Sequence, residues 1–288
     1  MNMADSPKKI KILVTGANGQ LGQELVRITA PDTEIVGLSR NELDVTNLAK
    51  CRNAIRSYKP NAVIHCAAYT NVDQAESEPD EAYRINAYGT RNAVMAAEEI
   101  GAKFVYISTD YVFDGRADKP YREYDTPNPQ SVYGKSKLAG EQLVQSLSSR
   151  FFIVRTSWVF GKYGGNFVKT MIRLASERDS IKVVNDQTGS PTYTLDLAQF
   201  LLELVRTEYY GIFHASNAGA CTWYEFAKAI FEERRIYVRI EPCMTSEFPR
   251  SALRPAYSVL DHGAIRVHGF KPFRSWRDAL KEYLTDEK

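Results

Sequence analysis

Short apolar runs alternate with longer amphipathic segments through the first 160 residues of the chain. Runs rich in Val, Ile and Phe predict β-strands at residues 9–14, 34–38, 62–66, 103–107 and 151–155. Between them, apolar residues recur at helical spacing after residue 20, at 46–58, at 79–100 and after residue 131. This alternation predicts an α/β protein built on a doubly wound parallel sheet.

A glycine-rich turn joins the first predicted strand to the first predicted helix. Glycines in such a turn let the backbone bend sharply and approach a pyrophosphate at the helix N-terminus, as in a Rossmann-type nucleotide site. The alternative is a turn that serves packing alone. We expect the cofactor phosphates to lie against Gly16, Asn18, Gly19, Gln20, Leu21 and Gly22.

The second predicted strand ends without the acidic residue that would hold an adenosine ribose hydroxyl. Ser39 and Arg40 stand there instead, about twenty residues after the glycines. A hydroxyl and a guanidinium suit a 2′-phosphate, which favours NADPH and leaves NADH as the alternative cofactor. The alternative for Arg40 is a solvated charge on the surface, with no role in binding. Asp44 and Val45 follow and are expected to border the adenine.

Small residues follow the third predicted strand. Ala67 and Ala68, with Tyr69 after them, would let a flat cofactor lie close to the strand end. His65, inside the apolar run, is expected to be a core histidine rather than a ligand. Asn86, within the predicted helix at 79–100, either bonds nearby backbone carbonyls or lies exposed.

Tyr133 and Lys137 stand four residues apart, so both project from one face of the predicted helix. An ammonium beside a phenol favours phenolate, which predicts a pKa of Tyr133 moved toward neutral pH. Such a tyrosine can give its proton to a ketone oxygen as a hydride arrives. Tyr224 and Lys228 share the spacing, but their segment reads as an ordinary amphipathic helix capped by Thr222.

The second half of the chain is less regular. It predicts a helix to about residue 178, a strand at 181–184, a polar loop at 185–193, a helix at 195–205, and short strands near 212–213 and 237–240. We expect a dinucleotide-binding domain over residues 9–160, to which later strands and helices return. Residues 161–288 are expected to form a smaller, mainly substrate-binding C-terminal lobe, interleaved with that domain.

Composition narrows the class of partner. The net charge of +2, from 37 basic and 35 acidic residues, argues against a nucleic-acid or membrane-surface partner and favours a small molecule. The four cysteines and four histidines show no zinc spacing, so no metal is expected. Residues 1–9 lack an apolar core, and no run reaches the roughly 18 apolar residues of a membrane span, which predicts a cytoplasmic protein.

Several motifs, in matching order along most of the chain, resemble the extended short-chain dehydrogenase/reductase superfamily. They are Thr-Gly-x-x-Gly-x-x-Gly at 15–22, Ala-Ala at 67–68, Ser-Thr at 108–109 and Tyr-x-x-x-Lys at 133–137. Longer phrases at 19–22, 67–73, 108–115 and 186–192 resemble the dTDP-4-dehydrorhamnose reductase family. The resemblance implies that NADPH or NADH reduces the C4 ketone of dTDP-4-dehydro-L-rhamnose to dTDP-L-rhamnose, a precursor of cell-surface polysaccharide.

The resemblance also implies roles for single residues. Tyr133 would donate the proton, Lys137 would tune it and hold the nicotinamide ribose, and the Thr109 hydroxyl would bond the sugar ketone. Trp158 would pack on the sugar, with core filling as the alternative. Arg254 is the candidate for the diphosphate, with a surface cation as the alternative. The expected substrate-binding residues are thus Thr109, Asp110, Trp158, Asn166 and Arg254.

Two other functions stay open within the resemblance. Related 4,6-dehydratases place an Asp-Glu pair directly after the threonine, whereas Asp110 and Tyr111 follow Thr109 here, which favours simple reduction. A nucleotide-sugar 4-epimerase uses the same tyrosine. The regulatory subunit of methionine adenosyltransferase is similar to this family and binds a partner enzyme without catalysis. Some relatives form metal-dependent dimers, which leaves a homodimer open.

Overall fold

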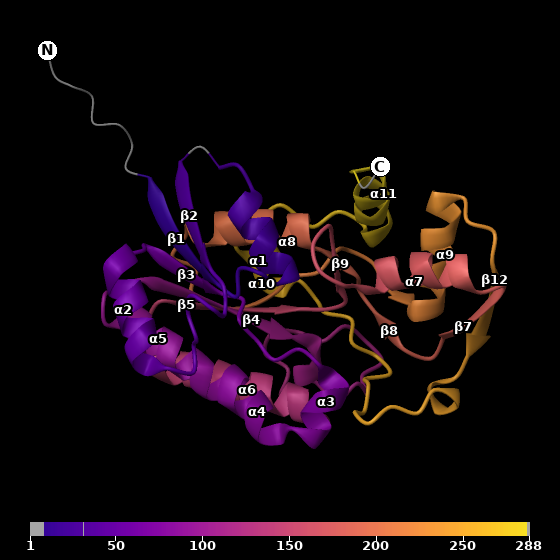
Figure 1. The fold of residues 1–288 in the computed structure, drawn as a ribbon, viewed down its shortest axis with the longest axis horizontal. Helices are drawn as coiled ribbons and strands as arrows, with labels where there is room; N and C mark the ends of the chain where they lie inside the picture. Colours follow the sequence, from indigo (N-terminus) through magenta and orange to yellow (C-terminus); the bar gives the residue numbers. More distant parts are fainter. Residues whose placement is uncertain (1–8, 31, 287–288) are drawn as a thin grey trace, which may run out of the picture.

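The structure of the protein is a computed structural model that describes residues 9–30 and 32–286. Within these residues, the centre of the fold is a sheet of six parallel strands in the order β10-β5-β4-β3-β1-β2 (Figure 1). The predicted doubly wound parallel sheet is confirmed. The strands are β1 (Ile10–Thr15), β2 (Thr33–Leu38), β3 (Ala62–His65), β4 (Lys103–Thr109), β5 (Phe151–Thr156) and β10 (Gly211–His214).

Helices cover both faces of this sheet (Figure 1). One face carries α1 (Gln20–Arg27), α8 (Thr194–Leu204) and α10 (Gly263–Val267), and the other carries α2 (Leu48–Tyr58), α5 (Thr90–Glu98) and α6 (Val132–Leu147). Each layer of helices buries its own apolar cluster against the strands. This is why the strands read as continuous apolar runs rather than as alternating ones.

The direction of the connections reverses between β1 and β3. From β1 the chain moves outward to β2, and after β3 it moves the other way through β4 and β5. Loops on either side of the reversal diverge and leave a crevice at the carboxyl ends of the strands, where ligands bind in open α/β sheets.

The predicted helix at 79–100 is interrupted by a π-helical turn. After α3 (Val72–Ser77), the chain forms α4 (Pro79–Tyr83), the π turn at Arg84–Gly89 and then α5. Asn86, in the π turn, is fully buried, and its backbone oxygen accepts a hydrogen bond from the Thr90 hydroxyl at 2.8 Å. Single π turns of this kind occur often at functional sites.

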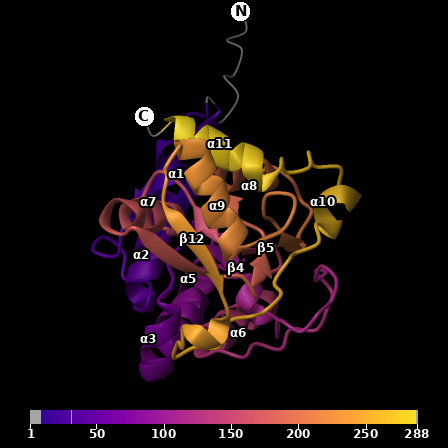
Figure 2. The same cartoon turned by 90° about the vertical axis from the view of Figure 1, so that its right-hand side faces the viewer.

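A smaller lobe follows β5 in the chain (Figure 2). Phe160, Phe226 and Tyr283 are among the residues of its core. Residues 194–214, which form α8 and β10, return to the main sheet, as does α10. The elements of the lobe are the strands β6 (Val159–Phe160), β7 (Ser180–Val184), β8 (Thr188–Gly189), β9 (Thr192–Tyr193), β11 (Cys221–Thr222) and β12 (Arg239–Cys243), and the helices α7 (Phe167–Glu177), α9 (Trp223–Arg234) and α11 (Trp276–Asp286), with short 3₁₀ turns at Asp110–Val112 in the main domain and Thr245–Glu247 in the lobe.

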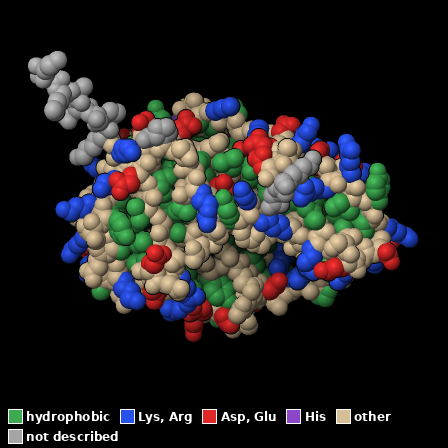
Figure 3. All heavy atoms as spheres, turned by 45° about the horizontal axis from the view of Figure 1, so that its top comes forward, with side chains coloured by type: hydrophobic (Ala, Val, Ile, Leu, Met, Phe, Trp, Pro, Cys, Tyr) green, Lys and Arg blue, Asp and Glu red, His purple; other side chains and the backbone are tan. Residues whose placement is uncertain are grey.

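On the face drawn in Figure 3, Lys and Arg side chains are interspersed with Asp and Glu side chains. This mixture fits the near-balance of 37 basic and 35 acidic residues in the chain. In the described part of the chain, no helix has the length and apolar character needed to span a bilayer.

A buried ion pair joins α6 to β5. The Arg155 guanidinium donates to the Glu141 carboxylate through two bonds of 2.9 and 2.7 Å, and the two side chains are 2% and 0% exposed. The Ser108 hydroxyl at the end of β4 donates to the same carboxylate at 2.5 Å. Because all three groups are paired, the charges are tolerated in the core.

We expect Glu141→Gln to lower the free energy of unfolding by about 3–5 kcal/mol, because it leaves the Arg155 charge buried without its counter-ion. Urea titration followed by circular dichroism measures this change. Glu177→Gln is the control, because Glu177 and Arg173 form an exposed pair on α7 that should contribute about 0.5 kcal/mol or less. Equal losses for both variants would contradict the assignment of Arg155–Glu141 as a structural pair.

Candidate active site

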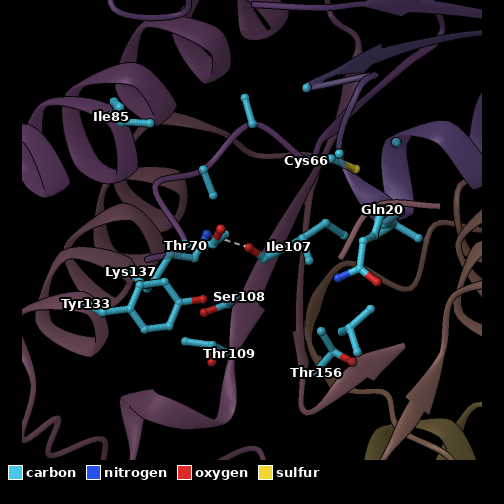
Figure 4. Close-up of a pocket in the computed structure, with 18 of the residues that line it drawn as sticks. Gln20, Cys66, Thr70, Ile85, Ile107, Ser108, Thr109, Tyr133, Lys137 and Thr156 are labelled. Atoms are coloured by element: carbon cyan, nitrogen blue, oxygen red, sulfur yellow. Dashed lines mark hydrogen bonds between the residues drawn. The ribbon is translucent and has the colours of Figure 1, made fainter. Parts of the chain in front are cut away.

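A cavity of about 770 Å³ opens at the carboxyl edge of the main sheet (Figure 4). Its walls come from the loops after β1, β2, β3, β4 and β5 and from the first turns of α6. These segments lie far apart in the sequence, and the reversal of the connections brings them together. The cavity therefore lies where the fold predicts a ligand.

The glycine-rich turn forms one end of the cavity. Gly16 has a φ of +67°, and a Cβ atom there would lie 2.6 Å from the Ala67 backbone nitrogen. A Cβ on Gly22 would overlap the Gly16 carbonyl oxygen. Side chains are thus excluded at both positions by sterics, and the turn leaves backbone exposed beside the N-terminus of α1. This geometry fits a dinucleotide pyrophosphate. All six residues expected there line the cavity: Gly16, Asn18, Gly19, Gln20, Leu21 and Gly22.

The residues expected near the adenosine divide into two groups. Arg40, Asp44 and Val45 line the cavity, and the Arg40 side chain is 78% exposed. Ser39 is buried, and both its backbone N–H and its hydroxyl donate to the Glu42 carboxylate. Ser39 is therefore engaged within the turn and does not line the cavity.

The end of β3 is divided in the same way. Ala67 and Ala68 line the cavity, whereas the Tyr69 hydroxyl donates to the Glu78 carboxylate at 2.8 Å. The Tyr69 backbone N–H donates to the buried Asn86 side chain, which in turn donates to the Tyr69 carbonyl and the Ser136 hydroxyl. Of the two alternatives for Asn86, the buried one with bonds to the backbone is correct.

His65 is a core residue, as expected. Its ring is 1% exposed and lies between the hydroxyls of Thr15 and Thr90, at 2.8 and 3.2 Å. Burial lowers the pKa of His65 to about 3, so the ring is neutral at physiological pH.

Tyr133 and Lys137 project from α6 into the cavity, toward the residues at the end of β4 (Figure 4). Ser131 caps the helix, since its hydroxyl accepts a bond from the Gly134 N–H at 3.1 Å. The Tyr133 phenol lies in hydrogen-bonding reach of the Thr109 hydroxyl. The Lys137 ammonium donates to the Ile107 carbonyl at 2.6 Å. The structure thus brings the three expected catalytic residues into one site.

The pKa of Tyr133 differs from the expectation. Burial raises it to about 12, and the contact with Thr109 offsets only part of that rise. Lys137 does not lower it, because its ammonium faces the Ile107 carbonyl and lies 4.1 Å from the centre of the Tyr106 ring. Burial also lowers the pKa of Lys137 to about 7. The expectation that the pKa of Tyr133 is shifted toward neutral pH is wrong for the ligand-free protein. Desolvation of the phenol there outweighs any lowering of its pKa by nearby groups.

On the substrate side, Thr109, Asp110 and Trp158 line the cavity. Burial raises the pKa of the Asp110 carboxyl to about 6. Trp158 has a φ of +47°, and its ring stacks on Trp223 with centroids 3.5 Å apart and an interplanar angle of 8°. A strained backbone at a cavity wall is characteristic of functional positions. Trp158 therefore faces the cavity rather than only filling the core.

Asn166 and Arg254 do not line the cavity. Asn166 caps α7, and its amide donates to the Gly161 carbonyl at 2.8 Å. Arg254 makes two bonds of 2.5 and 2.7 Å to the Asp73 carboxylate at the start of α3, and its side chain is 19% exposed. The surface-cation alternative for Arg254 is thus replaced by a partly buried ion pair.

The second Tyr-x-x-x-Lys pair lies elsewhere. Tyr224 and Lys228 belong to α9, which begins with the expected Thr222 cap as a capping box with Glu225, and neither residue lines the cavity. Sequence reasoning missed several wall residues. Cys66, Thr156 and Ser157 lie at the end of a strand or directly after one, and Gly164 and Gly165 form a glycine pair, so their positions were a signal. Thr70 carried no such signal.

The sequence of this chain matches one protein-family model, and its similar proteins include named reductases. The family model described as "RmlD substrate binding domain" matches residues 10–288. The spore coat polysaccharide biosynthesis protein SpsK of Bacillus subtilis (strain 168) is 46% identical over 96% of this chain and 97% of its own length. A dTDP-4-dehydrorhamnose reductase of Aggregatibacter actinomycetemcomitans is 43% identical over 94% of this chain and 97% of its own length.

Solved structures agree. The crystal structure of dTDP-4-dehydrorhamnose reductase from Bacillus anthracis str. Ames in complex with NADP is similar to this chain with a TM-score of 0.95 and 48% identity, covering 96% of this chain and 99% of that one. The resemblance indicated by the motifs is confirmed: the chain belongs to the RmlD substrate binding domain family, with dTDP-4-dehydrorhamnose reductases among its relatives.

Proposed function

We propose that this protein is an NADPH-dependent dTDP-4-dehydrorhamnose reductase, which converts dTDP-4-dehydro-L-rhamnose to dTDP-L-rhamnose. The observation that carries the proposal is that Tyr133, Thr109 and Lys137 face the same cavity as the glycine-rich turn. A proton donor and a cofactor cradle in one cavity are what carbonyl reduction requires. The relatives named as reductases, and the neighbour crystallised with NADP, support the same reaction and cofactor.

The glycine-rich turn at Gly16, Gly19 and Gly22 would hold NADPH, which would supply a hydride for C4 of the sugar. Tyr133 would give its phenolic proton to the C4 oxygen, which would otherwise remain on the sugar as an unstabilised alkoxide. A pKa of about 12 means that Tyr133 holds that proton at neutral pH in the ligand-free protein. The Thr109 hydroxyl lies beside the phenol and donates to the Asp110 carboxylate at 3.0 Å in the ligand-free protein. It would orient the ketone oxygen by turning that proton toward it. The nearby Lys137 ammonium stabilises the tyrosinate that forms.

Reduction is favoured over dehydration by the residue that follows Asp110. Tyr111 occupies that position, and its ring packs edge-on against Tyr133 with centroids 5.5 Å apart. Burial raises the pKa of the Tyr111 phenol well above its ordinary value. This side chain is therefore a poor acid for expelling water from the sugar, and it fills the space of a carboxylate that could do so.

We assign nucleotide binding mainly to residues 9–160 and sugar binding mainly to the lobe of residues 161–288. Trp158 offers its ring as a wall for the sugar. Arg254 would bind the diphosphate by exchanging its bonds with Asp73 for bonds with phosphate oxygens, while Asn166 would act through the loop that it caps.

We place the reaction in the cytoplasm, where thiols stay reduced, because Cys51, Cys66, Cys221 and Cys243 are all unpaired by disulfides. The proposed partner is the nucleotide-sugar substrate. We also propose a homodimer, and light scattering would measure its molecular mass.

The test of the proposed function is the loss of reduced-nicotinamide absorbance when the purified protein meets dTDP-4-dehydro-L-rhamnose, with NADPH and NADH assayed separately. Turnover with product identified as dTDP-L-rhamnose is expected. Retained NAD with no net consumption would instead identify an epimerase. Cofactor binding without turnover, together with a stoichiometric partner enzyme in a pull-down, would identify a regulatory subunit.

Tyr133→Phe should lower kcat by about 100-fold or more, because it removes the proton donor and little else. The dissociation constant for NADPH should stay within about threefold of the wild-type value. Steady-state kinetics and isothermal titration calorimetry measure the two quantities. Tyr224→Phe is the matched control and should leave both unchanged, since Tyr224 lies outside the cavity. Near-normal turnover of Tyr133→Phe would remove Tyr133 from the mechanism.

The buried Lys137 makes stability depend on pH. Its folded-state pKa of about 7 lies below the ordinary value of 10.5, so between these values the unfolded chain holds a proton that the folded chain releases. Stability therefore rises with pH through this window and is lost as pH falls toward 7, by at most about 1.4 kcal/mol per pH unit.

We expect the free energy of unfolding of the cofactor-free wild type, relative to Lys137→Met, to increase between pH of about 7 and about 10. Urea titrations at several pH values measure the difference. Lys135→Met, at an exposed position on the same helix, should show no such trend. A constant difference between wild type and Lys137→Met would mean that Lys137 keeps its ordinary pKa in the folded protein.

A further inference from the structure

The turn after β2 places a carboxylate beside the end of that strand. The Glu42 side chain folds back onto Ser39, and its Oε2 atom accepts one bond from the Ser39 backbone N–H at 2.8 Å and one from the Ser39 hydroxyl at 2.7 Å. These bonds hold the pKa of Glu42 below its ordinary value, so the carboxylate is charged at neutral pH. One acidic side chain thus takes both donors of the residue that follows β2.

This turn lies at the adenosine end of the cavity. In dinucleotide-binding folds, the group that recognises the adenosine ribose stands at the end of the second strand. Here the cavity extends past that point, because Arg40, Leu43, Asp44 and Val45 line it. Arg40 is the cation at this end of the cavity. Among the described residues, the only acidic contact of Arg40 is the distant one to Glu81 at 3.9 Å. An exposed pair at this distance is weak, which leaves the guanidinium available to a ligand.

The ribose 2′ position of the two nicotinamide cofactors makes opposite demands on such a turn. The 2′-phosphate of NADPH needs donors and positive charge, whereas the 2′-hydroxyl of NADH needs an acceptor. Arg40 meets the first demand and Glu42 the second. Ser39 and Glu42 do not line the cavity themselves but flank Arg40, which does. A 2′-phosphate held by Arg40 can therefore reach the two Ser39 donors only by displacing the Glu42 carboxylate, and it carries the same sign of charge.

We propose that Glu42 is a cofactor-specificity residue, which weakens the binding of the 2′-phosphate and so allows NADH to compete with NADPH. The inference rests on the proposed function, because it assumes that the cavity binds a nicotinamide dinucleotide. The bonds of Glu42 to Ser39, and the role that they suggest, could not be predicted from the sequence, where Ser39 and Arg40 favour NADPH.

The alternative role of Glu42 is to hold the turn together. The turn has backbone bonds of its own, since the Ser39 carbonyl accepts from the N–H groups of Glu42 and Leu43 at 3.1 and 2.8 Å. In Glu42→Gln, a neutral amide oxygen can still accept the Ser39 bonds, so this variant removes the charge and keeps the cap. A purely structural role therefore predicts equal effects on both cofactors, whereas a specificity role predicts unequal ones.

The experiment is isothermal titration calorimetry of the full-length protein with NADPH and with NADH, for wild type, Glu42→Gln and Glu34→Gln. Glu42→Gln should tighten NADPH binding by about five- to tenfold, and this gain should shrink as salt is added. NADH binding should stay unchanged or weaken. Glu34→Gln is the matched control, because Glu34 is an acidic residue at the opposite end of β2, paired with Lys11, and should change neither constant.

Arg40→Ala locates the 2′-phosphate independently and should weaken NADPH binding by about fivefold without affecting NADH. An equal change for both cofactors in Glu42→Gln, or no change for NADPH, would overturn the specificity role while leaving the proposed reductase intact. If the wild type binds neither cofactor, the proposed function fails, and the inference fails with it.

Discussion

The close packing of α6 against β4 is the constraint on which the site depends. A Cβ on Gly140 would overlap the Tyr106 hydroxyl, and a Cβ on Gly134 would overlap the Tyr111 carbonyl, so only glycines let the helix approach this closely. The Glu141–Arg155 ion pair then ties the same helix to β5. With the helix held at two places along its length, the side chains of its first turns have one position relative to the end of β4. That is how Tyr133 comes to face Thr109.

The sequence was sufficient for features that depend on local pattern. The parallel, doubly wound sheet could be predicted from the alternation of strands and helices, and the glycine-rich turn could be placed because it stands between a strand and a helix. Contacts between distant segments could not be predicted in this way. The stack of Trp158 on Trp223 and the pair of Arg254 with Asp73 join residues 65 and 181 positions apart, and no local pattern signals either. Most site residues drawn from strand ends therefore line the cavity, with Ser39 and Tyr69 as exceptions, whereas Asn166 and Arg254 do not.

The pKa of Tyr133 shows a second limit of sequence reasoning. Spacing on a helix shows that a tyrosine and a lysine can share a face, but not where the ammonium points or how much water reaches the phenol. Here the Lys137 ammonium is held by the Ile107 carbonyl, and burial acts on both groups. Each group is pushed toward its neutral form, so the ligand-free site avoids a buried charge. When Tyr133 gives its proton to the substrate, the tyrosinate that forms is stabilised by a protonated Lys137 nearby.

Carboxylates also occupy two groups suited to phosphates that lie outside the lining of the cavity. Arg254 is bound to Asp73, and the Ser39 donors are bound to Glu42, so these two groups already hold carboxylates in the ligand-free protein, whereas Arg40 has only its weak pair with Glu81. At Arg254 and Ser39, an anionic ligand must therefore exchange places with a carboxylate rather than bind an unsatisfied group. The free energy of binding is then a difference between two similar sets of hydrogen bonds, which reduces affinity for phosphate in general. The exchange favours selective binding. A ligand gains binding free energy only where its shape and charge match Arg254 or Ser39 better than the carboxylates of Asp73 or Glu42 do.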